Sequence, residues 1–268
     1  MNTTYLAVDI GASSGRHILG WVEQGKVCLR EIYRFENRAV HRNGRLCWDV
    51  DRLFEEVLQG LEACREQGFS PASVGIDTWA VDFVLLDRNG DPLGDAVAYR
   101  DSRTRGMDRL VEERIPFQEL YRRTGIQKQE FNTIYQIMAV KQQEPQLLER
   151  AQRLLMVPEY LTYRLTGKME NEYTNATTTG LVNAHSKTWD GELLDRLGYP
   201  RRLFGELRQP GFSVGGFAPQ VRERLGFDCK VLLPATHDTG SAFLAVPAKE
   251  DGVYLSSGTW SLLGTELP

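Results

Sequence analysis

Residues 8–16 read VDIGASSGR, a turn of glycine and serine that directly follows an apolar run. In many nucleotide-binding proteins such a turn opens a helix whose first amide groups bind phosphate. This stretch has neither the lysine of a P-loop nor the three-glycine spacing of a dinucleotide-binding fold. Residues 16–22, RHILGWV, alternate as a strand does. We therefore expect the turn to close a β-hairpin.

The expected hairpin turn has the chemistry of an anion site. Successive backbone N–H groups in a turn can form a concavity that holds an anion, and the hydroxyls of Ser13 and Ser14 add donors. Asp9, at the end of the first strand, suits a Mg²⁺ ion that keeps most of its water shell. The alternative is a plain hairpin turn without a ligand, and this stretch alone leaves both interpretations open.

Composition narrows the class of protein. The chain has 268 residues, enough for one large domain or two modest ones. Its net charge of −4 provides no basic field for nucleic acid or an anionic membrane. Four cysteines are scattered without a CxxC pair, so neither a disulfide framework nor structural zinc is expected. No signal peptide or apolar run of about 18 residues is evident. We expect a cytoplasmic protein.

The remaining chain alternates between strand and helix patterns. Residues 171–183 are polar and β-branched and predict a strand and loop, and 199–219 predict a connection. Residues 82–94 predict a hairpin that turns at Asn89-Gly90. Periodicity predicts strands at 3–10, 16–23, 26–35, 73–78 and 230–234, and helices at 50–67, 103–114, 117–124, 132–142, 158–166 and 190–197. A helix of small residues is expected after the turn at 235–240.

A strand, a turn of small residues and a second strand occur twice, at 4–24 and again at 252–267. The second copy includes Ser256-Ser-Gly-Thr-Trp260, another turn suited to phosphate. We expect residues 1–245 to form a first domain and residues 246–268 to begin a second.

Asp238 is the first candidate for catalysis. An apolar strand leads into Ala235-Thr-His-Asp-Thr-Gly240, and a helix of small residues follows at once. A carboxylate at a strand end can take the proton of a substrate hydroxyl. The alternative is that Asp238 only caps this helix, since Asp is a good N-cap residue. Taken alone, the segment favours neither.

The stretch Gly75-Ile-Asp-Thr-Trp-Ala-Val-Asp82 places two acids and a tryptophan at the end of another strand. Trp79 can form the wall of a sugar pocket and Asp82 can bind sugar hydroxyls. The alternative places Trp79 in the core and the acids in a turn. Residues 99–103, YRDSR, are either a second polar edge of that pocket or a helix cap with a solvated basic turn.

Together these segments resemble the FGGY family of carbohydrate kinases, in the superfamily of sugar kinases, actin and heat-shock ATPases. The resemblance covers the whole chain, in order. It is carried by VDIGASSGR (8–16), GIDTWAVDFVLLD (75–87), AYRDSRT (98–104), GIQKQEFNTIYQ (125–136), LTGKMENEYTNATTTGLVN (165–183), THDTGSA (236–242) and YLSSGTWSLLG (254–264). It implies an α/β fold of the ribonuclease H-like, actin-like ATPase kind, with a mixed central sheet, a β-hairpin phosphate loop, helices on both faces and a helical insertion.

The resemblance also implies a role for individual residues. The first phosphate loop would comprise Gly11, Ala12, Ser13, Ser14, Gly15 and Arg16, and the second would include Gly258 and Thr259. Asp9 would lie near Mg²⁺. Asp238 would be the general base, with His237 and Thr239 beside it at the sugar, and Trp79 and Ala80 would line the sugar pocket. Alanine at position 80 departs from the glycine that is frequent in similar kinases, and because the added methyl group is small we expect it at most to tighten the sugar pocket.

The implied reaction moves the γ-phosphoryl group of ATP, with Mg²⁺, to the 1-hydroxyl of L-rhamnulose. Members of the family have a second domain that binds adenosine, so we expect this chain to be an N-terminal portion with little turnover alone. Alternatives are a family kinase for L-fuculose or xylulose and a non-catalytic, actin-like ATP-binding module. We set a glycosidase aside, because phosphate-type hairpins have no purpose in one.

Overall fold

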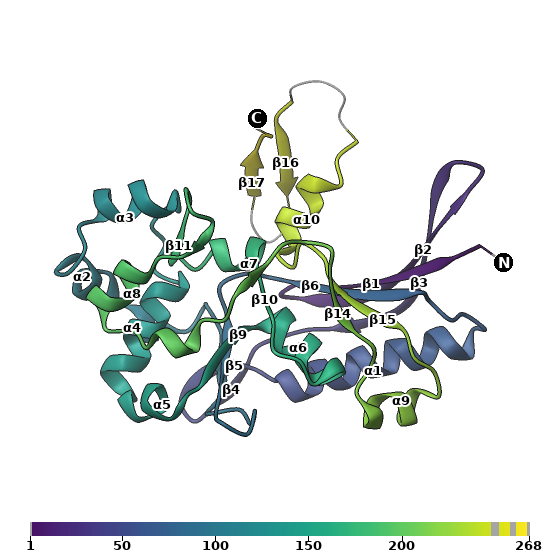
Figure 1. The fold of residues 1–268 in the computed structure, drawn as a ribbon, viewed down its shortest axis with the longest axis horizontal. Helices are drawn as coiled ribbons and strands as arrows, with labels where there is room; N and C mark the ends of the chain where they lie inside the picture. Colours follow the sequence, from purple (N-terminus) through teal and green to yellow (C-terminus); the bar gives the residue numbers. More distant parts are fainter. Residues whose placement is uncertain (1, 248–251, 258–260, 267–268) are drawn as a thin grey trace.

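A mixed six-stranded sheet forms the centre of the molecule (Figure 1). The computed structural model describes residues 2–247, 252–257 and 261–266. The strands follow the spatial order β14 (Phe212–Gly215), β15 (Lys230–Leu233), β6 (Ser73–Thr78), β1 (Thr4–Ile10), β2 (Ser14–Glu23) and β3 (Lys26–Glu36). β1 pairs antiparallel with β2 and parallel with β6, which is parallel to β15. The hairpin predicted for residues 4–23 is confirmed.

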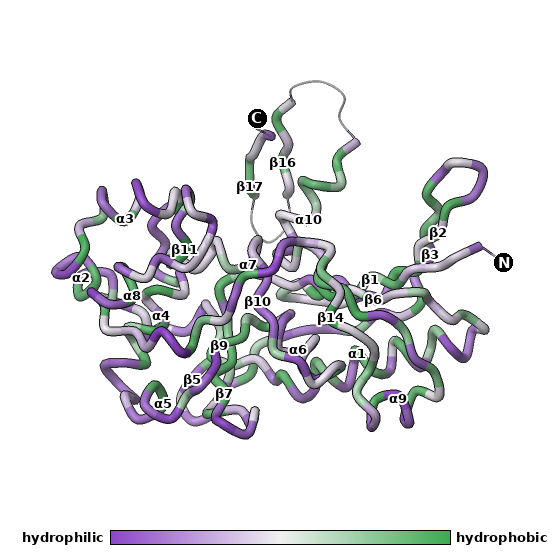
Figure 2. The backbone as a smooth tube through the Cα atoms, viewed as in Figure 1, coloured by the Kyte–Doolittle hydropathy of each residue, from purple (hydrophilic) through white to green (hydrophobic). Residues whose placement is uncertain are grey.

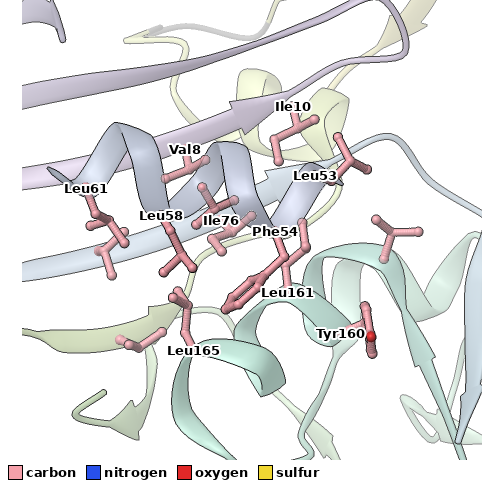
Figure 3. Packing of buried hydrophobic residues seen from close by; sticks show 14 of the residues in the cluster. Val8, Ile10, Leu53, Phe54, Leu58, Leu61, Ile76, Tyr160, Leu161 and Leu165 are labelled. Atoms are coloured by element: carbon pink, nitrogen blue, oxygen red, sulfur yellow. The ribbon is translucent and has the colours of Figure 1, made fainter. Parts of the chain in front are cut away.

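The first core lies between this sheet and its helices. In α1 (Val50–Glu66), Asp49 is the N-cap and accepts a hydrogen bond from the Arg52 amide, and the helix predicted at 50–67 is confirmed. Helices α1, α6 (Val157–Thr166) and α9 (Pro219–Leu225) lie on one side of the sheet, and α10 (Asp238–Leu244) lies on the other (Figure 1). Figure 3 shows Val8, Ile10 and Ile76 of the sheet packed with Leu53, Phe54, Leu58 and Leu61 of α1 and with Tyr160, Leu161 and Leu165 of α6.

A helical insertion builds a second hydrophobic core. The chain enters the insertion through β7 (Phe83–Leu86) and passes through β9 (Arg153–Met156) before α6. These two strands pair antiparallel with each other. Hydrophobic stretches concentrate in the strands, and hydrophilic stretches lie at outer helices such as α2 and α9 (Figure 2). The insertion contains η1 (Ser102–Thr104), α2 (Met107–Glu112), α3 (Phe117–Thr124), α4 (Thr133–Gln143), α5 (Pro145–Arg150), α8 (Gly191–Leu197) and η2 (Arg201–Leu203).

Shorter elements complete the fold. One of them, the hairpin β16–β17, lies above α10 near the C-terminal end (Figure 1). In the described ranges no helix has the length and apolar character needed to cross a membrane. The short elements are β4 (Val40–Arg42), β5 (Arg45–Trp48), β8 (Ala96–Val97), β10 (Asn171–Glu172), α7 (Tyr173–Thr177), β11 (Val182–Asn183), β12 (Thr188–Trp189), β13 (Leu207–Arg208), β16 (Tyr254–Ser257) and β17 (Ser261–Gly264).

Two sequence predictions need correction. The helix expected at 103–114 is divided, because Gly106 has a φ of 77° and separates η1 from α2. The hairpin expected at 82–94 is shorter than predicted. The Leu93 amide donates to the Leu85 carbonyl at 2.7 Å, the Asp87 amide donates to the Asp91 carbonyl at 2.9 Å, and Leu86 and Pro92 form one isolated bridge. The strand that pairs regularly with β7 is β9.

The segments predicted as loops contain further structure. Residues 171–183 hold helix α7, and 199–219 hold β14, which pairs with β15 in the central sheet. Neither α5, β9 nor α9 was predicted. These elements are short, and α7 is stabilised mainly by polar side chains that are buried and hydrogen-bonded, a feature that hydrophobic periodicity does not detect.

Candidate active site

A cleft of about 1000 Å³ lies at the end of the sheet where the parallel strands β1 and β6 terminate. The β1–β2 turn, the end of β6, the start of α10, residues 125–132 and the hairpin β16–β17 surround it. The structure thus brings together segments that are far apart in sequence. The predicted site residues that line the cleft are Asp9, Gly11, Ala12, Ser13, Trp79, Ala80, His237, Asp238 and Thr239.

The β1–β2 turn is a tight loop held in shape from outside. The Gly11 amide donates to the Ser14 carbonyl at 2.9 Å. Asn37, which the sequence did not single out, donates through Nδ2 to the Gly11 carbonyl at 2.8 Å, and its amide donates to the Ser13 carbonyl at 3.0 Å. These bonds occupy the carbonyls of Gly11, Ser13 and Ser14. Gly11, Ala12 and Ser13 line the cleft.

Gly15 has a packing role in the loop, and Ser14 and Gly15 already belong to β2. A Cβ on Gly15 would lie 2.1 Å from Cζ of the Phe35 ring, which is far too close for any side chain. Glycine here allows the ring of β3 to support the turn from behind. Ser14 and Gly15 do not line the cleft wall as Ala12 and Ser13 do.

Arg16 faces Asp9 across the hairpin. The two residues are paired in the β1–β2 register, and Arg16 Nε lies 3.4 Å from Asp9 Oδ2. Both side chains are about two-fifths exposed, at 41% and 40%. Burial raises the pKa of Asp9, and the Arg16 charge opposes part of that rise. Arg16 thus forms an ion pair with the carboxylate of Asp9.

Three carboxylates converge at this edge of the sheet. Asp77 is the register partner of Asp9 on the neighbouring parallel strand. Burial raises the pKa of Asp77 well above its usual value, and the charges of Asp9 and Asp238 raise it further. Within the described ranges, however, no three His, Cys, Asp or Glu side chains are grouped so that they hold a metal ion by themselves.

Asp238 opens helix α10. The N-cap position falls on His237, so the alternative in which Asp238 is the cap is wrong by one residue. Asp238 Oδ1 accepts hydrogen bonds from the Thr239 amide at 2.6 Å and the Thr239 hydroxyl at 3.2 Å, and His237 Nε2 lies 3.6 Å away. Burial lowers the pKa of His237, which favours the neutral imidazole. The Asp238 carboxylate borders the cleft.

Trp79 satisfies both interpretations made from sequence. It is only 6% exposed and packs on Trp48 with ring centroids 4.1 Å apart, yet it lines the cleft. The expectation that Asp82 binds sugar hydroxyls is wrong. Asp82 is 1% exposed and accepts hydrogen bonds from Trp48 Nε1, Trp79 Nε1, the Tyr99 amide and Gln136 Nε2. Its acceptor capacity is used to fix the pocket wall.

The wall contains a strained turn. The Asp82 amide donates to the Ala80 carbonyl at 2.9 Å, which closes a γ-turn around Val81. Val81 has a φ of 68°, a conformation that a β-branched residue rarely adopts. Thr133 Oγ1 donates to the Val81 carbonyl at 2.7 Å and holds the turn from α4. Strain of this kind persists only where surrounding contacts impose it, and it is frequent at functional sites.

The far wall of the cleft comes from the helical insertion. Residues 125–132 contribute several polar side chains, which the sequence associated with the family without giving them a role. Of residues 99–103, only Tyr99 lines the cleft, while Asp101 caps η1 and Arg103 donates to Gln136. The lining side chains of this wall are Tyr121, Ile126, Gln127, Gln129, Phe131, Asn132 and Thr178.

The second predicted phosphate loop is described only in its flanks. β16 and β17 form the expected hairpin, and Ser256 and Ser261 line the cleft opposite the β1–β2 turn. Gly258 and Thr259 lie outside the described residues.

Comparison with known proteins relates this geometry to a family. Residues 4–245 match the FGGY family of carbohydrate kinases, N-terminal domain. A rhamnulokinase of Oceanobacillus iheyensis is 52% identical over 266 residues, which are 99% of this chain and 57% of that protein. A rhamnulokinase of Halalkalibacterium halodurans is 55% identical over 261 residues, or 97% and 56%. The chain thus spans little more than half the length of these relatives.

Solved structures share the fold at lower identity. A ligand-bound xylulose kinase from Lactobacillus acidophilus has a TM-score of 0.79 at 22% identity, covering 88% of this chain and 48% of that one. A gluconate kinase from the same species has a TM-score of 0.80 at 21% identity, covering 89% and 48%. These matches establish the actin-like ATPase fold expected from sequence. The family match, which spans most of the chain, shows that this chain belongs to the FGGY family of carbohydrate kinases.

Proposed function

We propose that this chain provides the phosphate loop and the sugar site of an ATP-dependent rhamnulokinase. The reaction would transfer the γ-phosphoryl group of ATP to the 1-hydroxyl of L-rhamnulose, giving L-rhamnulose 1-phosphate and ADP. The observation that carries the proposal is that the β1–β2 turn and the Asp238 carboxylate open onto one cleft. The proposal also rests on the rhamnulokinases at 52% and 55% identity. We propose a cytoplasmic setting, where ATP is available.

Phosphoryl transfer depends on positioning and on neutralising charge rather than on covalent chemistry. In the proposal, Ala12 and Ser13 of the β1–β2 turn bind phosphate oxygens through backbone amides and the Ser13 hydroxyl. The turn is shaped by Ser14, Gly15 and Arg16, which follow it in the chain. Arg16 also adds positive charge beside Asp9. The second phosphate loop would include Gly258 and Thr259. Residues 1–245 would then form the sugar-binding domain, and 246–268 the start of the ATP-binding domain.

Asp238 would act on the sugar. Its carboxylate would accept the proton of the 1-hydroxyl as the new P–O bond forms, while the Thr239 amide and hydroxyl keep it in one orientation. His237 and Thr239 would add polar contacts to the sugar. Trp79 and Ala80 would form the apolar wall beneath the ring, held by the Asp82 hydrogen bonds and the Val81 turn.

The acids at the cleft edge fit a Mg²⁺ ion held largely through water. Asp9, Asp77 and Asp238 are close enough for their charges to raise the pKa of Asp77, and a hydrated dication relieves that repulsion. Asp9 would hold the ion, with Asp77 beside it. When bound, Mg²⁺ neutralises charge on the β- and γ-phosphates.

The test joins residues 1–268 to the C-terminal remainder of the Oceanobacillus iheyensis relative; we call this the joined protein. ADP release is measured with L-rhamnulose, L-fuculose and xylulose, and the product is identified by mass spectrometry. We expect kcat/KM to be highest for L-rhamnulose by at least about tenfold. A preference for xylulose or L-fuculose would transfer the assignment to that sugar. ATP binding without any sugar phosphate would instead support a non-catalytic module.

Residues 1–268 alone are the matched comparison. Closure of the cleft around ATP requires contacts from both sides, so we expect weak sugar binding by calorimetry and little turnover. Phosphorylation of L-rhamnulose by these residues alone at the rate of the joined protein would contradict this expectation.

A further inference from the structure

The segment that precedes Asp238 is held by only a few side-chain and bridge contacts. β15 ends at Leu233, so regular pairing stops before residues 234–237. On the sheet side, the Thr78 amide donates to the Thr236 carbonyl at 3.0 Å, and Thr78 and His237 form a single bridge. The N-cap residue His237 makes no side-chain cap bond to α10. The orientation of the Asp238 side chain therefore depends on the contacts that fix Thr236.

Glu172 holds Thr236 from the other side. It is fully buried at the end of β10. Its Oε2 accepts a hydrogen bond from the Thr236 amide at 3.1 Å and another from the Thr236 hydroxyl at 2.8 Å. Together with the Thr78 bond, these contacts engage the amide, the carbonyl and the side chain of Thr236. A residue so constrained has little freedom to rotate.

The same carboxylate also organises helix α7. Glu172 is its N-cap: Oε1 accepts from the Thr174 amide at 2.8 Å, and Oε2 accepts from the Asn175 amide at 3.1 Å and the Thr174 hydroxyl at 2.6 Å. α7 then returns to the same segment, because Asn175 Nδ2 donates to the Thr236 carbonyl at 3.3 Å and the His237 amide donates to the Thr174 hydroxyl at 3.5 Å. Glu172 thus joins α7 and the Thr236–Asp238 segment in one hydrogen-bonded unit.

We infer that Glu172 is a positioning residue, which orients Asp238 for proton transfer by fixing Thr236. This inference rests on the proposed function, in which Asp238 is the general base. All its partners donate, so an acceptor-only carboxylate suits the position. A glutamine at position 172 would have an NH2 group in place of one carboxylate oxygen. That NH2 group would face other donors, so the hydrogen bonds to Thr236 or to α7 would be lost.

The decisive variant is Glu172→Gln, and Asp190→Asn is the matched control. Asp190 is likewise a buried acidic N-cap, accepting from the Leu193 amide, but it caps α8 in the helical insertion. Both variants should lose stability. In Glu172→Gln of the joined protein we expect kcat to fall about 10- to 100-fold with KM for ATP unchanged, the size that a misplacement of the base produces. In Asp190→Asn we expect kcat within about twofold of the unsubstituted protein.

Thr236 provides the readout that a purely structural role would not give. Thr236→Ser keeps the hydroxyl and should retain kcat, whereas Thr236→Val should lower it. Combined with Glu172→Gln, Thr236→Val should lower kcat by less than the product of the single effects, since both remove one interaction. Multiplicative losses would overturn the inference, as would an equal loss of kcat in Asp190→Asn.

Amide hydrogen exchange on residues 1–268 separates this inference from the proposed function. Exchange at Thr236–Thr239 should be faster in Glu172→Gln and unchanged in Asp190→Asn. Unchanged exchange at these amides in Glu172→Gln would overturn the inference even if the joined protein is an active kinase. Absence of turnover in the unsubstituted joined protein would overturn the proposed function, while the exchange result still decides whether Glu172 holds the segment.

Discussion

Asp9 and Asp82 both lie near the carboxyl ends of parallel strands, but their surroundings are opposite. The Asp9 carboxylate borders the cleft, pairs with Arg16 and has other acids beside it. The Asp82 carboxylate is buried behind the cleft wall and accepts four hydrogen bonds. An acid surrounded by donors fixes structure, whereas an acid left facing solvent and like charges is available to a ligand.

The same contrast separates the other acids of the region. Asp77 and Asp238 belong with Asp9. Asp77 has like charges nearby, and among the described residues Asp238 accepts hydrogen bonds from its neighbour Thr239 and is approached by His237. Glu172 belongs with Asp82, because donors surround it. We therefore expect substitutions of Asp9 and Asp238 to change rates directly. Substitutions of Asp82 and Glu172 should lower stability, and at Glu172 the rate should fall as well, through the position of Asp238. Asp77 is buried, so its substitution should also change stability.

The largest expected effect is on the rate in Asp238→Asn. An amide cannot take the sugar proton, so kcat of the joined protein should fall about 100- to 10,000-fold, measured as ADP release with L-rhamnulose. The melting temperature should change little, because Asp238 makes few contacts. Asp195→Asn, which removes an exposed carboxylate paired with Arg201, is the control and should keep full activity. A kinase that retains its rate in Asp238→Asn would show that this carboxylate is not the base.

The next largest effect is on stability in Asp82→Asn. Asparagine has one acceptor oxygen in place of two, so its N–H groups would face either Gln136 Nε2 or the indole donors of Trp48 and Trp79. Either orientation leaves a buried donor without its acceptor. We expect the free energy of unfolding to fall by about 2–4 kcal/mol, measured by urea denaturation. Asp87→Asn, at an exposed turn just after β7, should lose much less. An unchanged unfolding curve in Asp82→Asn would remove the distinction between the two groups.

Asp77→Asn should raise the free energy of unfolding, whereas Asp82→Asn should lower it. Because burial and like charges raise the pKa of Asp77, the folded state binds its proton more tightly than the unfolded state does. The contribution of this group to stability therefore increases as pH falls toward its unfolded pKa of 3.8. Neutralising the side chain should therefore raise the free energy of unfolding at pH 7.

Urea denaturation between pH 4 and pH 7 checks this prediction. The variant should show a shallower dependence of unfolding free energy on pH than the unsubstituted chain. A loss of stability at pH 7 would place Asp77 with Asp82 among the acids that hold the structure.

The smallest effect is expected on KM for L-rhamnulose in Ala80→Gly. The side chain lines the cleft, and removing its methyl group exposes little surface. At about 0.8 kcal/mol per methyl-sized group, Ala80→Gly should change KM for L-rhamnulose by less than about fivefold. A change in which sugar is preferred would show instead that this position selects the substrate.

Much of the fold follows from local sequence patterns. The alternation in residues 3–35 and the helical spacing of apolar residues in 50–67 predict three strands and α1, because these signals arise between residues close in the chain. The pairing of β7 with β9 was not predictable from residues 82–94, since the partner strand lies beyond the helices of the insertion. Likewise, α7 depends on Glu172 and on Thr236, which is remote in sequence.

The sequence by itself determined the hairpin turn at 11–13, the acids near strand ends and the family to which the chain belongs. Only the tertiary structure decided which acids face the cleft. Trp48, Tyr99 and Gln136 reach Asp82 from three separate segments and use its oxygens, while no donor in the part of the chain that the structure describes bonds to the Asp77 side chain. The reason is physical: a carboxylate's behaviour depends on the donors and charges within a few ångströms, and these come from distant parts of the chain.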